Sequence, residues 1–98
     1  MRIYAYMNES AKLFAGLCHP ARLEILEALI KSKGCVSELQ LRTGRNQPNL
    51  SQHLRVLRYA RLVDYRKEGR NVCYFVSRPE VAKLLKIAKE MYPEGEHG

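Results

Sequence analysis

Apolar side chains at helical spacing dominate the first 60 positions of the chain. They recur three or four residues apart, which places them on one face of an α-helix. Interruptions at His19-Pro20, Gly34 and Gly44 divide this region into four predicted helices. Asn8 is the predicted N-cap of the first helix, and Pro20 suits the first turn of the second.

The third and fourth predicted helices are short and adjacent. Ser37 is the predicted N-cap of a helix over residues 38–43, which Gly44 closes in a left-handed conformation. Asn46 caps the fourth helix, with Pro48 in its first turn. The inward stripe of this fourth helix consists of leucines at positions i, i+4 and i+7, which are Leu50, Leu54 and Leu57.

The period of the apolar pattern changes from helical to two after Leu62. Val63, Tyr65, Val72, Tyr74 and Val76 alternate with polar residues around the turn-rich segment 67–71, which predicts a β-hairpin with a charged tip. Ser77 and Pro79 then begin a last helix. Its apolar stripe, which we expect to pack against a partner, consists of Val81, Leu84, Leu85, Ala88 and Met91.

The order of these elements predicts a mainly α domain with a small β-hairpin. A short helix, a glycine turn, a second helix with a polar outer face and a basic hairpin form the arrangement of a winged helix-turn-helix. We expect one domain over residues 1–93 that binds DNA and dimerises, followed by a disordered tail at 94–98.

Positive charge is concentrated in one stretch of the chain. The net charge of the 98 residues is +7, and residues 42–70 contribute +6 of it, with eight Arg or Lys against two carboxylates. A local excess of this kind predicts a polyanion as the partner. No apolar run approaches the roughly 20 residues that span a membrane, and the first residues do not resemble a secretory signal. We therefore expect a cytoplasmic protein without a membrane partner.

The outer face of the fourth predicted helix has the chemistry of base recognition. Asn and Gln pair bidentately with adenine in the major groove, and Arg pairs with guanine. The predicted base-reading residues are Gln47, Asn49, Ser51, Gln52 and Arg55. The residues predicted to contact the DNA backbone, from the flanks of this helix and the hairpin tip, are Arg42, Arg45, Arg58, Lys67 and Arg70.

Two segments resemble a known family. Residues 51–57, SQHLRVL, with Leu62-Val63 and Gly69-Arg70, and residues 19–26, HPARLEIL, are similar to the arsenic-repressor (ArsR/SmtB) family. The resemblance implies a homodimer through the first and last helices that represses transcription until an inducer binds. That family usually has glycine after the helix that corresponds to the fourth predicted helix, whereas this chain has Arg61. If Arg61 is left-handed, its conformation costs about 1 kcal/mol of folding free energy relative to glycine.

A second departure concerns the inducer. The family's arsenic and cadmium sensors carry Cys-Val-Cys at the third helix, where this chain has Cys35-Val36-Ser37, and residues 81–91 lack the Asp and His ligands of the family's zinc site. Soft metal ions need two or three thiolates. The ligands at both of these family sites are therefore incomplete. The predicted inducer is a thiol-reactive species or a metal ion, and a regulator without an inducer is the alternative.

The three cysteines are the candidate sensors of such a thiol-reactive inducer. Cys18, Cys35 and Cys73 are odd in number and far apart in sequence, which argues against a disulfide and for reduced thiols. Cys18 and Cys73 have apolar neighbours, so we expect them to be small core residues. Cys35 is the best candidate sensor. The family's persulfide sensors use a cysteine in the last helix, and this last helix has none.

The alternative functions for this sequence are an enzyme and a winged-helix module that binds a partner other than an operator under inducer control. An enzyme needs a nucleophile with its base, a metal cage or a phosphate-binding glycine loop, and none is recognisable here. Winged helices also serve as protein-interaction modules or RNA binders, or as constitutive DNA-binding modules without an inducer. A protein-docking module would carry apolar residues on the outer face of the fourth helix. The polar face therefore favours double-stranded DNA, with an inverted-repeat operator for a symmetric dimer.

Overall fold

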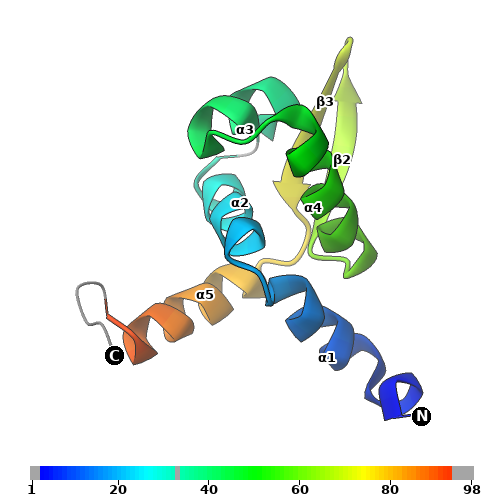
Figure 1. Ribbon diagram of the computed structural model, residues 1–98, viewed down its shortest axis with the longest axis vertical. Helices are drawn as coiled ribbons and strands as arrows, with labels where there is room; N and C mark the ends of the chain where they lie inside the picture. Colours follow the sequence, from blue (N-terminus) through cyan, green and yellow to red (C-terminus); the bar gives the residue numbers. More distant parts are fainter. Residues whose placement is uncertain (1–2, 33, 94–98) are drawn as a thin grey trace.

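The computed structural model describes the backbone of residues 3–32 and 34–93 and the side chains of residues 9–32 and 34–93. The predicted tail at 94–98 lies outside the described residues. The elements in chain order are α1 (Ile3–Leu17), α2 (Pro20–Lys31), β1 (Gly34–Cys35), α3 (Val36–Thr43), α4 (Gln47–Tyr59), β2 (Val63–Glu68), β3 (Asn71–Val76) and α5 (Glu80–Met91). Helices α2, α3 and α4 gather beside the hairpin, whereas α1 and α5 lie at the end opposite its tip (Figure 1).

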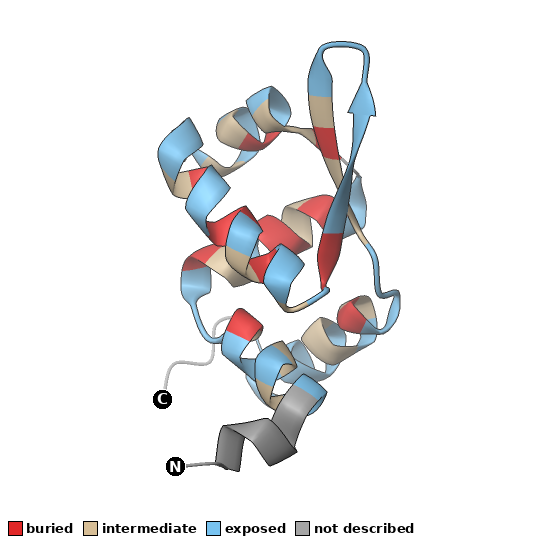
Figure 2. Cartoon of the chain, turned by 90° about the vertical axis from the view of Figure 1, so that its right-hand side faces the viewer, coloured by how far each residue is buried: buried red, intermediate tan, exposed pale blue. Residues whose placement is uncertain are grey.

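The core lies where α2, α3 and α4 meet the base of the sheet, drawn red in Figure 2. The leucine stripe predicted for α4 is confirmed, because Leu50, Leu54 and Leu57 are all buried. The other buried members of this cluster are Ile25, Leu26, Leu29, Leu39, Leu62, Val63 and Val81. Burial of these side chains supplies the main favourable free energy of folding and determines which face of α4 remains in water.

The hairpin is confirmed, and it has a third strand that the sequence pattern did not indicate. Strands β2 and β3 pair antiparallel from Val63↔Val76 to Glu68↔Asn71, and Gly69 between them has φ 66°. Strand β1 pairs antiparallel with the other edge of β3, which gives the order β1-β3-β2. A strand of two residues is too short to show a period of two, so pairing with β3 alone reveals it.

The predicted helix ends are partly confirmed. The Asn46 side chain caps α4 by accepting the backbone N–H of Asn49 at 2.9 Å, and Gly44 ends α3 with φ 70°. Arg61 is left-handed, with φ 64°, so the condition attached to its departure from the family's glycine is met. His19 occupies the boundary before α2, where its Nδ1 accepts the N–H of Ala21 at 3.0 Å.

Two predicted helix starts are wrong. Helix α1 begins at Ile3, so Asn8 lies inside it and is not the N-cap. Helix α3 begins at Val36, with Cys35 as its N-cap and Ser37 within its first turn. The Cys35 N–H donates to the Glu38 carboxylate at 3.0 Å. Because β1 holds Cys35 in an extended conformation, the chain turns directly from strand to helix two residues before the position favoured by Ser37.

Helices α1 and α5 leave apolar side chains uncovered. Phe14 on α1 is 60% exposed, and Met91 on α5 is 63% exposed. Of the stripe predicted for the last helix, Val81 is buried and Leu84 is half-buried. A groove of 360 Å³ between these helices is lined in part by Leu13, Ala60, Leu62, Val81 and Leu84. Among the described residues, this end of the molecule is less completely buried than the leucine stripe of α4. Dimerisation through α1 and α5 stays a prediction.

Candidate nucleic-acid interface

Helix α4 presents a polar face beside a basic hairpin. Burial of its leucines turns four of the five predicted base-reading side chains into water, and these are Gln47, Ser51, Gln52 and Arg55. Their amide, hydroxyl and guanidinium groups match the donors and acceptors on base edges. The fifth, Asn49, is half-buried because its side chain is bonded within the protein.

The flanking arginines already have partners inside the chain. Arg42 Nη1 donates to the carbonyl oxygens of Ala28 at 2.9 Å and Ser32 at 3.0 Å, which satisfies backbone acceptors at the end of α2. Arg45 Nε donates to the Glu24 carboxylate at 3.1 Å. Both arginines therefore join elements of the helix-turn-helix, and their predicted phosphate contacts stay predictions.

Arg58 connects α4 to the hairpin. Its guanidinium lies over the Tyr65 ring, 4.4 Å from the ring centroid, and its Nε is 3.9 Å from the Asp64 carboxylate. The ring centroids of Tyr65 and Tyr74 are 5.6 Å apart, and burial raises the pKa of Tyr74. A groove of 330 Å³ runs between α4 and the hairpin, lined by Ser51, Arg55, Arg58, Tyr65, Lys67, Val72 and Tyr74. Lys67 and Arg70 are exposed near the hairpin tip.

His53 faces the interior of the domain. It is 6% exposed, and its Nδ1 lies 3.4 Å from Arg22 Nη1. Burial lowers the pKa of His53, with smaller contributions from His19 and the Arg22 guanidinium. Arg22 Nε also donates to the Gly16 carbonyl at 2.7 Å, so this arginine joins α1, α2 and α4. Sequence reasoning missed Arg22, because an arginine on a helix carries no signal of its partners.

Comparisons with known proteins agree with this geometry. The pattern of the bacterial regulatory proteins of the arsR family matches residues 19–65. An uncharacterised HTH-type transcriptional regulator of Mycobacterium tuberculosis is 40% identical over 82 residues, which are 83% of this chain and 72% of that protein. The chain belongs to the ArsR family. Members of this family are transcription regulators, so this ArsR chain regulates transcription and is not an enzyme.

Further relatives extend the likeness over most of the ArsR chain. A transcriptional repressor SmtB homolog of Synechocystis is 33% identical over 89 residues, which are 91% of this chain and 67% of that protein. A homodimeric winged helix-turn-helix DNA-binding domain from Mycobacterium bovis, described as a possible ArsR-family transcriptional regulator, has a TM-score of 0.79 at 25% identity. That likeness covers 99% of this chain and 94% of the other. The predicted family and fold are confirmed.

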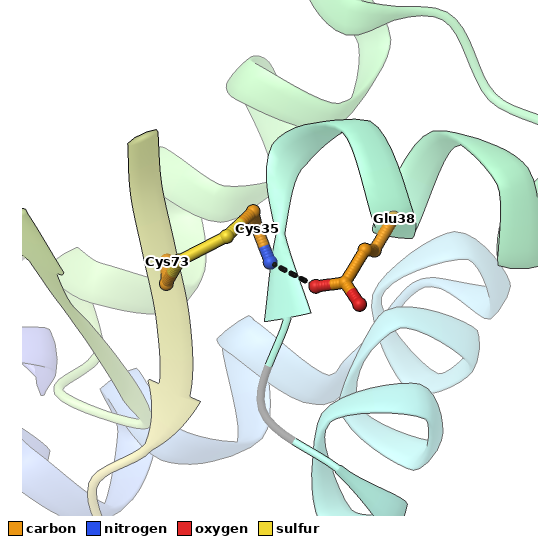
Figure 3. Close-up of a disulfide and its surroundings, with 3 residues drawn as sticks. All are labelled: Cys35, Glu38 and Cys73. Carbon is orange, nitrogen blue, oxygen red and sulfur yellow. Dashed lines mark hydrogen bonds between the residues drawn. A yellow bond between two sulfur atoms is a disulfide. The ribbon is translucent and has the colours of Figure 1, made fainter. Parts of the chain in front are cut away.

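The cysteines of this ArsR chain are arranged differently from the prediction. Cys35 and Cys73 form a disulfide between β1 and β3, drawn in Figure 3 beside the Glu38 carboxylate that accepts the Cys35 N–H. The expectation of reduced, unpaired thiols is wrong for this pair, because strand pairing places the two residues opposite each other although 38 positions separate them. Cys73 is 5% exposed, as predicted, whereas Cys18 is exposed and is not a core residue.

The metal sites of the family do not fit the residues present. Cys35 is bonded to Cys73, and Ser37 stands where the second thiolate of the third-helix site would be. Within residues 9–32 and 34–93, no three His, Cys, Asp or Glu side chains gather closely enough to hold a metal ion. No helix in the part of the chain that the structure describes is long and apolar enough to cross a membrane.

Proposed function

We propose that this ArsR chain is a homodimeric, sequence-specific repressor that binds double-stranded DNA in the cytoplasm. The observation that carries the proposal is the division of α4 into a buried leucine face and an exposed polar face beside the basic hairpin. The major groove of B-DNA admits one α-helix, and an exposed Gln52 or Arg55 has the donors and acceptors to read base edges there. Lys67 and Arg70 supply charge for phosphates or the minor groove.

A symmetric pair of chains accounts for the uncovered apolar surface. Exposed side chains on α1 and α5, including Phe14 and Met91, would be buried against a second copy. A two-fold axis through this end would present two α4 helices to one face of a duplex. We therefore infer an inverted-repeat operator whose half-site centres lie about 34 Å, one DNA turn, or a multiple of it apart.

The protein-interaction alternative is less well supported. A docking surface for another protein has an apolar centre from which charged residues are depleted. The outer face of α4 instead exposes Ser51, Gln52 and Arg55. The same polar face does not distinguish an inducible repressor from a constitutive DNA-binding module, so the inducer needs its own argument.

We infer that the inducer is a thiol-reactive species acting at Cys35 and Cys73. Two thiols and one hydrogen peroxide molecule yield the disulfide and two water molecules, with the sulfurs oxidised and the peroxide reduced. The bond joins the residue before α3 to a strand of the hairpin. Helix α3 and the hairpin both flank α4. Because the disulfide joins them, they cannot move independently when the protein docks on a duplex. We therefore expect the disulfide to lower DNA affinity. A metal inducer is the weaker alternative, because the donor set is incomplete among the described residues.

The experiment has two stages. First, the purified protein, with its cysteines reduced, is titrated against a random duplex library at low ionic strength, and retained sequences are recovered. Failure to retain any duplex would refute the DNA-binding proposal.

Second, the reduced protein on its selected site is treated separately with zinc, arsenite, persulfide and peroxide. We expect peroxide or persulfide to release DNA from wild type and from the Cys18→Ser control, but not from Cys35→Ser. Release that is equal in Cys35→Ser would exclude this cysteine pair, and no release by any agent would favour a constitutive regulator.

A further inference from the structure

The groove between α4 and the hairpin has one wall on the helix. Ser51, Arg55 and Arg58 stand at positions i, i+4 and i+7 of α4, so they share one side of the helix, and all three line the groove. Gln52 lies on a different side of α4 and is not among the lining residues. The two base-reading candidates Gln52 and Arg55 therefore face different parts of a bound duplex.

The other wall of the groove is one face of the hairpin. Side chains alternate along a strand, so Tyr65 and Lys67 lie on the same face of β2 as the buried Val63. Their partners across the ladder are Tyr74 and Val72, which lie on this face as well. This wall therefore consists of two aromatic rings nearer the core and a lysine nearer the tip of the hairpin.

The lining of the groove is rich in positive charge and hydrogen-bond donors. It contains three cations and three hydroxyl groups, and none of its seven residues, which all belong to the described part of the chain, is acidic. The Arg58 guanidinium lies over the Tyr65 ring, and the Asp64 carboxylate 3.9 Å from Arg58 Nε is not part of the lining. Burial raises the pKa of Tyr74 above its ordinary value of 10.0, so its hydroxyl keeps the proton at neutral pH. Cations and O–H donors together suit the oxygens of a phosphate.

The position of the groove determines which part of a duplex it meets. In the proposed function, α4 enters the major groove and the hairpin tip reaches the adjacent minor groove. One sugar-phosphate strand separates these two grooves of the duplex, so that strand passes between the helix and the hairpin. The groove at this place has a volume of 330 Å³, which is large beside the share of about 30 Å³ that one water molecule occupies in the liquid.

We propose that this groove binds one phosphodiester of the DNA backbone, with the Arg55 guanidinium and the Tyr74 hydroxyl as donors to its oxygens. The inference rests on the proposed DNA-binding function and deepens it. It assigns Arg55 to a phosphate and leaves Gln52 as a base reader. It also gives a DNA contact to Tyr74, for which the sequence pattern indicated only a place in a strand.

The test locates the phosphate and the residues that contact it. The reduced protein is titrated against duplexes of its selected site, each with one half-site phosphate replaced by an uncharged methylphosphonate. Arg55→Met should weaken binding to the unmodified duplex by about tenfold, because a hydrogen bond to a charged group is lost. At one phosphate position, the methylphosphonate should weaken wild type but cause little further loss in Arg55→Met. Such non-additivity in a double-mutant cycle identifies a direct contact.

Two further variants test the hairpin wall. Tyr74→Phe keeps the ring and removes only the hydroxyl, and its loss of affinity should be non-additive at the same phosphate as that of Arg55→Met. Arg66→Met is the matched control, since Arg66 is an exposed arginine on the opposite face of β2, over the Phe75 ring. Its effect should be additive with every methylphosphonate. Circular dichroism confirms that each variant is folded.

A second measurement separates a phosphate contact from a base contact. Arg55→Met should lower the magnitude of the salt dependence, log K against log salt, by about 0.9 and should weaken binding equally to all base substitutions of the site. A loss confined to one base pair, with the salt dependence unchanged, would make Arg55 a base reader and overturn the inference.

Inorganic phosphate is the probe for a free anion in the groove. At equal ionic strength, we expect phosphate to displace wild type from DNA no better than chloride does, because one contact in an open groove is weak without the rest of the duplex. Stronger displacement by phosphate that disappears in Arg55→Met would assign the groove to a free anion and overturn its assignment to the DNA backbone.

The outcomes distinguish this inference from the function on which it rests. Losses in Arg55→Met that are additive with every methylphosphonate would overturn the phosphate site and leave sequence-specific DNA binding intact. Coupling of Arg55 and Tyr74 to different phosphates would do the same. Wild-type protein that binds no duplex would overturn the proposed function together with the inference.

Discussion

Helices α4 and α5 carry similar apolar stripes, yet the chain buries only one of them. Leu50, Leu54 and Leu57 of α4 lie in the core, whereas α5 buries Val81 and leaves Met91 63% exposed. The stripe of α4 meets α2, α3 and the sheet within the same chain, whereas α5 lies at the end opposite the hairpin tip, where Lys89 pairs with Glu27 of α2 (Figure 1). A single chain therefore completes the packing of α4 by itself, while its α1 and α5 end leaves apolar side chains exposed.

The largest effect is expected from a charge placed on α5. Ile87→Glu introduces a carboxylate at an exposed apolar position and should convert a dimer into monomers, because burying an unpaired charge is costly. Affinity for a two-half-site operator should fall on the order of 100-fold, since linked half-site binding is lost. Sedimentation measures the oligomeric state, and fluorescence anisotropy measures the affinity for DNA.

Leu41→Glu, at an exposed position on α3, is the control and should remain dimeric. An unchanged oligomeric state in Ile87→Glu would contradict the prediction that α5, unlike α4, buries its apolar stripe against a second chain.

A change on the outer face of α4 should affect reading without affecting assembly. Gln52→Ala removes an exposed amide and should weaken binding to the selected operator by about 1 to 3 kcal/mol, with little change on random DNA. Anisotropy titrations on both duplexes provide the measurement. Equal loss on both duplexes would remove Gln52 from base recognition.

The hairpin tip should contribute affinity without sequence preference. Arg70→Ala removes one exposed charge and should weaken binding to all duplexes. The slope of log K against log salt should decrease in magnitude by about 0.9, the value for one phosphate contact on B-DNA. Titrations at four salt concentrations determine the slope, and Arg78→Ala, outside the hairpin, is the control. A slope equal to that of wild type would place Arg70 away from the duplex.

The smallest effect concerns the pH dependence of stability. The folded-state pKa of His53 lies below its ordinary value of 6.5, chiefly because the ring is buried, so the unfolded chain binds the proton more readily. The free energy of unfolding should therefore be largest above pH 6.5 and decrease as the pH falls from there through the folded-state pKa. Urea denaturation between pH 7.5 and 5 measures it. His53→Gln should flatten this dependence, and an equally steep curve would assign it to other groups.

Local pattern accounts for most of the fold. Leucines at i, i+4 and i+7, the cap at Asn46 and the glycine at Gly44 are each signals within a few residues, and each is confirmed. The family's glycine at the position of Arg61 indicated where a left-handed residue could occur, and the structure shows one there. The division of α4 into a buried and a polar face follows from the same local periodicity, so the exposed base-reading candidates were predictable as well.

Contacts between distant segments could not be predicted from local pattern. Strand β1 exists because it pairs with β3, and that pairing brings Cys35 to Cys73. Arg45, in the loop between α3 and α4, is bonded to Glu24 on α2 and to Asn49 on α4, and no spacing in the sequence predicts these bonds. The sequence alone therefore determined which side of α4 faces water, since a helical period fixes that locally. Only the tertiary structure decided which of those side chains are already bonded inside the protein, because such partners depend on how separate segments pack in space.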